Sequence, residues 1–151
     1  MPLDRIGDAP KRREDSRFLT GSGAYLDDLR FEGMAHAVIV RSSHAHAAID
    51  GMDTDTARGM PGVLGVFTNV DTDIDGLRPM QPTVVANVQT NEPLLFPDQH
   101  MLARDRVRFV GEPVALVVAE TKAQAVDAAE AIAVDYRPLP AVTTPEAAMA
   151  P

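Results

Sequence analysis

Residues 107–133 read VRFVGEPVALVVAETKAQAVDAAEAIA, and this stretch decides the fold class. Its first residues are β-branched and apolar, which favours a strand, and Gly111-Glu112-Pro113 favours a tight turn. An uninterrupted apolar run then extends from Val114 to Ala119. Because a strand with one face in water alternates apolar and polar residues, this continuous run predicts a strand that is buried on both faces.

A helix is predicted directly after this strand. Thr121 lies three residues before Gln124, the spacing of a capping box, in which each side chain pairs a backbone N–H that the first helical turn leaves free. Apolar residues then recur at helical spacing, so the predicted helix covers residues 121–133. Ala133 to Tyr136 has strand character. Strand, helix and strand together predict a β-α-β unit with a right-handed crossover.

Length and composition exclude several classes of protein. The 151 residues are enough for one domain that folds without disulfides. Because the sequence contains no cysteine, the chain cannot ligate an iron–sulfur cluster through thiolates or use a thiol nucleophile. The net charge of -8 argues against a nucleic-acid surface, which needs clustered Lys and Arg. No apolar run has the length of a membrane span or of a signal-peptide core, so we expect a cytoplasmic location.

The other segments predict a mixed α/β domain of the α+β class, with a mixed sheet, two main helices and a long irregular insertion. Residues 34–40 and 63–68 have the composition of buried strands, and Asp53 to Arg58 predicts a short helix between them. Residues 69–100 form the irregular insertion, in which only residues 83–88 have strand character.

Three regions are expected along the chain. Residues 1–16 are polar and charged and have no periodicity, which is typical of an N-terminal arm. Residues 17–142 form the expected domain. Residues 143–151 begin a helix or a linker, because Thr143 or Thr144 can cap a helix that has Pro145 in its first turn.

An acidic segment resembles half of a calcium loop. Residues 71–76, which read DTDIDG, match the first six positions of an EF-hand loop. The twelfth position, where a Glu closes the coordination shell, is Pro82, and neither flank has a helical pattern. We therefore interpret the segment as a solvated acidic turn. Calcium binding at Asp71, Asp73 and Asp75 is the alternative.

Two other patterns favour structural interpretations. His44 and His46 can lie on one side of an extended segment, as zinc ligands do, but a third ligand is missing unless the fold brings His36 or His100 close to them. Ser42 and Ser43 precede His44 without the glycine-flanked elbow of a nucleophilic serine. We interpret the histidines as hydrogen-bonded loop residues and the serines as a turn. The residues by themselves thus identify no catalytic, cofactor-binding or metal site.

Short motifs that follow one another along nearly the whole chain resemble a known family. They are Arg13-Glu14-Asp15, Arg17-Phe18-Leu19-Thr20-Gly21, Gly23, Tyr25, Asp27-Asp28-Leu29, Val40-Arg41-Ser42, His44-Ala45-His46-Ala47, Pro61-Gly62-Val63, residues 108–115, Asp135-Tyr136 and residues 139–142. Together they resemble the N-terminal α/β-hammerhead domain of the molybdenum hydroxylase large subunit. Aldehyde oxidases, xanthine dehydrogenases and aerobic carbon monoxide dehydrogenases share this domain.

The resemblance implies one component of an oxidoreductase. Members of the family oxidise aldehydes, N-heterocycles or carbon monoxide with a molybdopterin cofactor, and electrons leave through iron–sulfur clusters and FAD. The cofactor-binding segments and the catalytic glutamate belong to downstream domains, so no catalytic residue and no cofactor bound by this chain alone is implied. The implied partners are the molybdopterin-binding domains or subunit, an iron–sulfur small subunit and a flavin medium subunit. The chain is then either a truncated large subunit or one part of a split one.

The alternative function is a free-standing binding or assembly module without catalysis.

Two sets of residues acquire roles from the resemblance. Leu95 and Phe96 have, relative to Val110-Gly111, the spacing of an apolar pair that lines the funnel to molybdenum in xanthine dehydrogenase-like members. Packing of a long loop onto the core is the other interpretation of this pair. An arm without periodicity gains order by docking, so the arm is expected to contact a partner subunit or a neighbouring domain. The candidate contact residues are Arg13, Arg17, Phe18 and Gly21.

Overall fold

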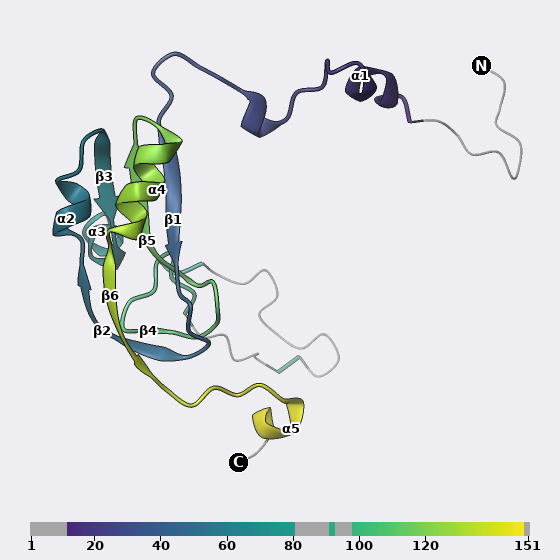
Figure 1. Ribbon diagram of the computed structural model, residues 1–151. Coiled ribbons are helices and arrows are strands. Elements are labelled where there is room, and N and C mark those ends of the chain that lie inside the picture. Colours follow the sequence, from purple (N-terminus) through teal and green to yellow (C-terminus); the bar gives the residue numbers. More distant parts are fainter. Residues whose placement is uncertain (1–11, 81–90, 93–97, 150–151) are drawn as a thin grey trace, which may run out of the picture. The chain divides into compact units, whose positions relative to one another are not determined.

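The computed structural model describes residues 12–80, 91–92 and 98–149. The chain divides into two compact units, Met1–Met34 and Ala35–Pro151 (Figure 1). The sequence predicts that the domain begins at residue 17, whereas the second unit begins at Ala35. The strand predicted at residues 83–88 and the funnel candidates Leu95 and Phe96 lie outside the described residues.

The first unit contains two short elements, helix α1 (Asp15–Leu19) and the 3-10 helix η1 (Leu26–Asp28). α1 ends in a Schellman motif. The N–H of Gly21 donates to the carbonyl of Phe18 at 3.1 Å, and the next N–H along the chain donates to the carbonyl of Arg17 at 2.9 Å. The segment that was predicted as an arm therefore contains the first residues of a helix.

The second unit is built on a three-stranded antiparallel sheet with strand order β1-β5-β3. Its strands are β1 (His36–Arg41), β3 (Val63–Phe67) and β5 (Pro113–Ala119). β5 is central and contains the predicted apolar run. Ala115, Val117 and Ala119 are fully buried on one face, whereas Leu116 and Val118, at the alternate positions, keep partial exposure. The described part of the chain therefore closes only one face of β5.

Helix α4 (Lys122–Glu130) covers the closed face of this sheet (Figure 1). It begins at the predicted cap, where the hydroxyl of Thr121 accepts the N–H of Gln124 at 3.3 Å and donates to the Gln124 side-chain oxygen at 2.8 Å. It ends at Glu130, earlier than the predicted Ala133. The buried residues that form the first core with Ala128 of α4 are Ala57, Val66, Ala115, Val117 and Ile132.

A second antiparallel sheet has the strand order β4-β2-β6. Its strands are β2 (Ala47–Asp53), β4 (Arg106–Val107) and β6 (Ala133–Pro138). β5 and β6 lie in different sheets, so the predicted β-α-β crossover is wrong, and two antiparallel sheets replace the predicted mixed sheet. The burial pattern of β6 explains this: Val134 and Tyr136 are half-buried, whereas Asp135 and Arg137 are exposed. Such alternation suits an antiparallel sheet with one face in water.

A β-bulge at Val114 contributes to the contact between the two sheets. Val40 pairs with Ala115 and Arg41 pairs with Pro113, so Val114 has no partner in β1. Its side chain is fully buried in a second core, with Ala47, Ala103 and Val107. Both cores are small and aliphatic, because the largest fully buried side chains are four valines.

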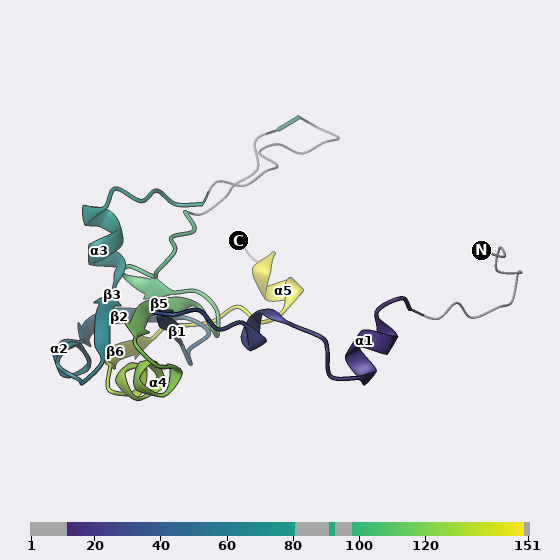
Figure 2. The ribbon, with the colours of Figure 1, turned by 90° about the horizontal axis from the view of Figure 1, so that it is seen from above.

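Three short helices complete the second unit: α2 (Asp55–Arg58), α3 (Asn69–Ile74) and α5 (Pro145–Ala148). α2 is the core of the helix that was predicted from Asp53. α5 begins as predicted, with Thr144 Oγ1 accepting the N–H of Ala147 at 3.2 Å. α3 and α4 lie on opposite sides of the β1-β5-β3 sheet (Figure 2). Within the described ranges, no helix combines the length and apolar character that a membrane crossing requires.

Candidate functional site

Motif segments that are far apart in the sequence meet at the turn formed by residues 108–113. The N–H of Gly111 donates to the carbonyl of Ser42 at 2.8 Å, and the N–H of Ser42 donates to the carbonyl of Glu112 at 2.9 Å. The guanidinium of Arg41 donates to the carbonyl of Gly111 at 2.8 Å. The end of β1 and the start of β5 are therefore joined by three hydrogen bonds between two of the motifs.

Ser42 is the buried polar residue of this junction, with 3% exposure. Its Oγ donates to the carbonyl of His44 at 3.1 Å and accepts the N–H of His44 at 2.9 Å, which confirms the predicted turn. The His44 ring lies 4.7 Å from the ring of Tyr136 in β6. Burial raises the pKa of the Tyr136 hydroxyl, and its hydrogen bond with Ser42 opposes that rise. The junction thus links β1 to a strand of the second sheet.

Ser42→Ala is expected to lower the free energy of unfolding by about 1–2 kcal/mol, because it leaves the N–H of His44 without its acceptor. Ser43 is exposed, so Ser43→Ala is the matched control and should change that free energy by less than about 0.5 kcal/mol. Urea unfolding followed by circular dichroism measures both. Equal losses in the two variants would contradict the importance of the buried hydroxyl.

His46 makes a second contact between motifs. Its Nδ1 lies 2.6 Å from the carbonyl oxygen of Pro140, and because a carbonyl only accepts, Nδ1 is assigned the proton. The N–H of Leu139 donates to the carbonyl of His46 at 2.9 Å. His44 contacts Tyr136 and His46 contacts Pro140, so the two rings have separate partners, as predicted for loop histidines. In the described part of the chain, no three His, Cys, Asp or Glu residues gather as possible metal ligands.

A cavity of about 550 Å³ opens beside this junction. Its lining residues are Ala45, His46, Arg106, Arg108, Phe109, Val110, Pro140, Ala141 and Val142. Arg106 pairs with Asp105 at 3.0 Å, whereas no described carboxylate lies within ion-pair distance of the Arg108 guanidinium. Among the described lining residues there is no carboxylate, hydroxyl or thiol side chain. The cavity therefore offers cations beside apolar surface, which suits contact with an acidic or carbonyl-bearing group and provides no acid–base pair.

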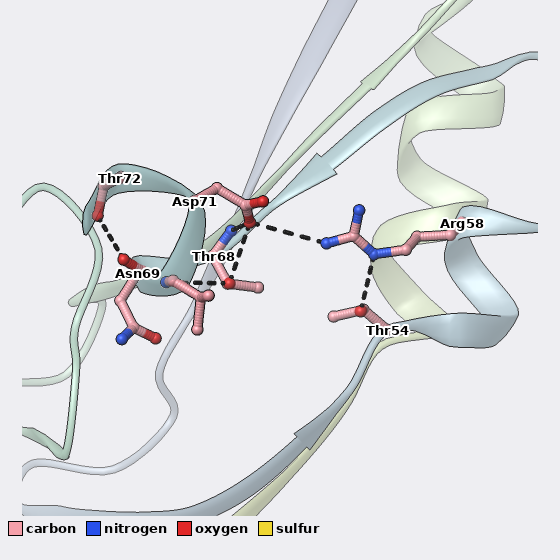
Figure 3. Close-up of polar contacts among 7 residues, drawn as sticks. Thr54, Arg58, Thr68, Asn69, Asp71 and Thr72 are labelled. Carbon is pink, nitrogen blue, oxygen red and sulfur yellow. Dashed lines mark hydrogen bonds and ion pairs between the residues drawn. The ribbon is translucent and has the colours of Figure 1, made fainter. Parts of the chain in front are cut away.

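The acidic segment at residues 71–76 does not form the predicted solvated turn, because most of it belongs to helix α3 (Figure 3). Thr68 is the N-cap: its hydroxyl accepts a first-turn N–H at 3.3 Å, and the Asp71 carboxylate accepts the N–H of Thr68 at 2.7 Å. Gly76, with a φ of 67°, follows the helix, and its N–H donates to the carbonyl of Asp73 at 3.0 Å. The glycine that resembled the bend of a calcium loop therefore terminates a helix.

The carboxylates considered for calcium have separate partners. The Asp71 carboxylate accepts the N–H of Thr68 and lies 3.7 Å from the guanidinium of Arg58 (Figure 3). That guanidinium also donates to the hydroxyl of Thr54. Asp73 forms an ion pair with Arg104. Residues two apart on a helix point in directions that differ by about 200°. Asp71 and Asp73 therefore do not converge as alternate residues of an EF-hand loop do.

Asp71→Asn is expected to destabilise the protein at neutral pH, and the difference from the wild type should shrink as the pH falls. The hydrogen bond from the backbone of Thr68 lowers the pKa of the Asp71 carboxyl below its ordinary value of 3.8, although burial opposes this. Because that pKa is lower in the folded state, the ionised carboxylate stabilises the fold above the unfolded-state pKa. This contribution is lost as the pH falls through the folded-state pKa. Urea unfolding at about pH 7 and about pH 2 measures it, and a difference that persists in acid would contradict the assignment.

The contact candidates of the first unit lie close together along α1 and its end. The Phe18 ring stacks on Tyr25 with centroids 5.4 Å apart, and the guanidinium carbon of Arg17 lies 5.1 Å from the Phe18 centroid. Gly21 ends α1, and Arg13 is exposed. Phe18 keeps 39% of its surface exposed. The structure therefore gathers Arg17 and Phe18 in one aromatic and cationic cluster, and their role in subunit contact stays a prediction.

Comparison with known proteins identifies the family. The model of the aldehyde oxidase and xanthine dehydrogenase a/b hammerhead domain matches residues 20–140. The carbon monoxide dehydrogenase large chain of Afipia carboxidovorans is 42% identical over 149 residues, covering 99% of this chain and 17% of the relative. The xanthine dehydrogenase molybdenum-binding subunit of Escherichia coli O157:H7 is 37% identical over 133 residues, covering 87% of this chain and 17% of the relative.

Solved structures agree with this match. Quinoline 2-oxidoreductase from Pseudomonas putida 86 is 44% identical and has a TM-score of 0.78, covering 95% of this chain and 17% of that chain. The chain thus spans 17% of the length of these relatives. Its two small antiparallel sheets and short helices are the fold that the matched domain adopts. The chain therefore belongs to the aldehyde oxidase and xanthine dehydrogenase a/b hammerhead domain family, that of the molybdenum hydroxylases.

Proposed function

We propose that this chain is the N-terminal structural and assembly domain of a molybdopterin-dependent oxidoreductase and that catalysis belongs to the rest of the enzyme. The observation that carries the proposal is the use of the motif residues: Ser42, Gly111 and His46 form hydrogen bonds that hold the motif segments together. The share of 17% of the relatives' length leaves most of such an enzyme to other protein. The complete enzyme would hydroxylate aldehydes or N-heterocycles, or oxidise carbon monoxide.

The chain lacks the cysteines that ligate the iron–sulfur clusters of such an enzyme. Its described part gathers no set of metal ligands. We therefore assign molybdopterin, iron–sulfur clusters and FAD to the molybdopterin-binding domains or subunit, an iron–sulfur small subunit and a flavin medium subunit. The name of the Escherichia coli relative, a molybdenum-binding subunit, supports this. We place the assembly in the cytoplasm.

Co-purification tests the proposal. The tagged chain is expressed with the molybdopterin domains and the small and medium subunits of the proposed enzyme, and molybdenum and iron are measured in the purified complex. We expect a complex that contains both metals, whereas the chain purified alone should contain neither. The destabilised variant Ala128→Asp is the control and should assemble less than the wild type. A folded wild-type chain that never associates would favour the alternative, a free-standing binding or assembly module.

Two finer roles belong to the same proposal. Leu95 and Phe96 line the substrate funnel of the complete enzyme, so Leu95→Ala and Phe96→Ala should alter KM and leave the molybdenum content unchanged. Arg13, Arg17, Phe18 and Gly21 contact a partner subunit or neighbouring domain. The exposed Phe18 cluster supports this second role. Phe18→Ala should then weaken subunit association and leave the unfolding of the second unit unaffected.

A further inference from the structure

We propose that the open face of the β1-β5-β3 sheet is the docking site for an apolar segment of the rest of the large subunit. The inference rests on the proposed function, because its occupant comes from the same enzyme. It goes further by naming the surface, the chemistry of the occupant and the residues that hold it.

A row of large apolar side chains crosses this face. Ile39 of β1 pairs directly with Leu116 of β5, and Leu116 pairs directly with Phe67 of β3. Directly opposite residues of antiparallel strands point to the same side of a sheet. Ile39 is 42% exposed and Phe67 is 41% exposed. The row therefore presents large apolar surface to the solvent across all three strands.

Gly65 supports the position of the Phe67 ring in this row. A Cβ atom at Gly65 would lie 2.8 Å from two atoms of the ring, so a larger residue at that position would displace it. On one side the row meets helix α3, which lies on this side of the sheet (Figure 2). The row and helix α3 border a cavity of about 400 Å³. The other residues that line this cavity are Asp71, Thr72, Asp75, Leu77, Met101, Leu102 and Pro113.

The apolar character of this groove does not match its exposure. The largest fully buried side chains of the protein are valines, whereas the groove leaves a phenylalanine, an isoleucine, Leu77 and Met101 exposed. The sequence of β5 is that of a strand buried on both faces, yet the described residues close only the face toward α4. A continuous apolar surface of this kind marks an interaction site. A second layer of protein on the face opposite α4 would bury these exposed apolar side chains.

The length of the relatives identifies that layer. In the carbon monoxide dehydrogenase large chain and in quinoline 2-oxidoreductase, the matched domain is 17% of one continuous chain. The remaining protein is tethered to the domain, so its local concentration is high, and an apolar segment of it can cover the groove without the entropy loss of free association. We therefore assign the groove to the rest of the large subunit in preference to a second copy of this chain.

The test measures binding of this chain to the large chain of the Afipia carboxidovorans enzyme from which the matched segment has been deleted. The variant Ile39→Thr/Phe67→Thr removes the two outer members of the row, leaves Leu116 in place and keeps residues that favour strands. The control Leu64→Thr/Val126→Thr replaces two exposed apolar residues that do not line the groove. Circular dichroism confirms folding of each variant. We expect the groove variant to bind about tenfold or more weakly than the wild type and the control to bind within about threefold.

Each other outcome has a defined meaning. A folded groove variant that binds like the wild type overturns the inference and leaves the proposed function standing. A wild-type chain that does not bind the truncated large chain also overturns the inference, whereas the proposed function is decided by the co-purification described above. A wild-type chain that instead dimerises, with the dimer lost in the groove variant, assigns the face to a second copy and also overturns the inference. Binding of an apolar fluorescent dye to the groove is an independent measurement. The dye fluorescence should be lower with the groove variant than with the wild type, and it should fall when the wild type forms the complex.

Discussion

Ala128→Asp is expected to lower the free energy of unfolding of the second unit by about 4 kcal/mol or more at neutral pH. Ala128 is fully buried on α4, in the first core with Val66, Ala115 and Val117. None of these side chains can hydrogen-bond or pair with a carboxylate. An unpaired charge in such a place destabilises a protein by about 4 kcal/mol or more, against a total stability of about 5–15 kcal/mol.

Ala123→Asp is the matched control for this change. Ala123 is exposed in the first turn of the same helix, where the helix dipole favours a negative charge. The free energy of unfolding of the Ala123→Asp variant should therefore stay within about 0.5 kcal/mol of the wild-type value. Thermal unfolding followed by circular dichroism measures both variants. A cooperative transition of Ala128→Asp near the wild-type temperature would show that α4 does not seal the core.

Gly62→Ala is expected to lower the free energy of unfolding by about 2–3 kcal/mol, as the sum of two contributions. Gly62 has a φ of 78°, a left-handed conformation that disfavours other residues by about 1–2 kcal/mol. A Cβ atom there would also lie 2.2 Å from the amide nitrogen of the Gln124 side chain. Displacing that side chain breaks its 2.8 Å hydrogen bond from Thr121, which contributes about 1 kcal/mol.

Two further variants separate the contributions. Gly111 has a φ of 89° and nothing within 4 Å of an added Cβ, so Gly111→Ala should show only the backbone contribution. In a Gln124→Ala background, Gly62→Ala should cost about 1 kcal/mol less than in the wild type, because the obstructing side chain is gone. Urea unfolding of the four chains of this cycle gives the coupling. Additive effects would show that the Gln124 side chain moves aside freely.

Local signals in the sequence predicted most elements of the second unit. Thr121 and Gln124 form hydrogen bonds three residues apart, and Thr144 with Pro145 begins α5 in the same way. The same kind of signal at Thr68 and Asp71 was overlooked in favour of the calcium pattern. It was readable, because a threonine followed three residues later by an aspartate is a capping box.

The site was only partly predictable. The motifs that contain Ser42, Arg108 and Gly111 are visible in the sequence, but the basic cavity that Arg106 and Arg108 line is not. Their alternate spacing on a short extended segment, within an acidic chain, was the available signal. This segment lies beside His46 and Pro140 because β2 pairs with β4 and because His46 forms a hydrogen bond with Pro140, 94 residues away in the sequence. No local pattern contains such information.

The sequence alone determined that β5 is central, where α4 begins, and that the chain contains none of the thiolates needed for iron–sulfur clusters. Caps and apolar runs act over three to six neighbouring residues, so they are visible in one sequence. Only the tertiary structure decided that β6 joins β2 in a second sheet and that the described residues leave the row at Ile39 partly exposed. Strand partners are chosen by burying faces that belong to distant segments, and burial depends on which other protein is present.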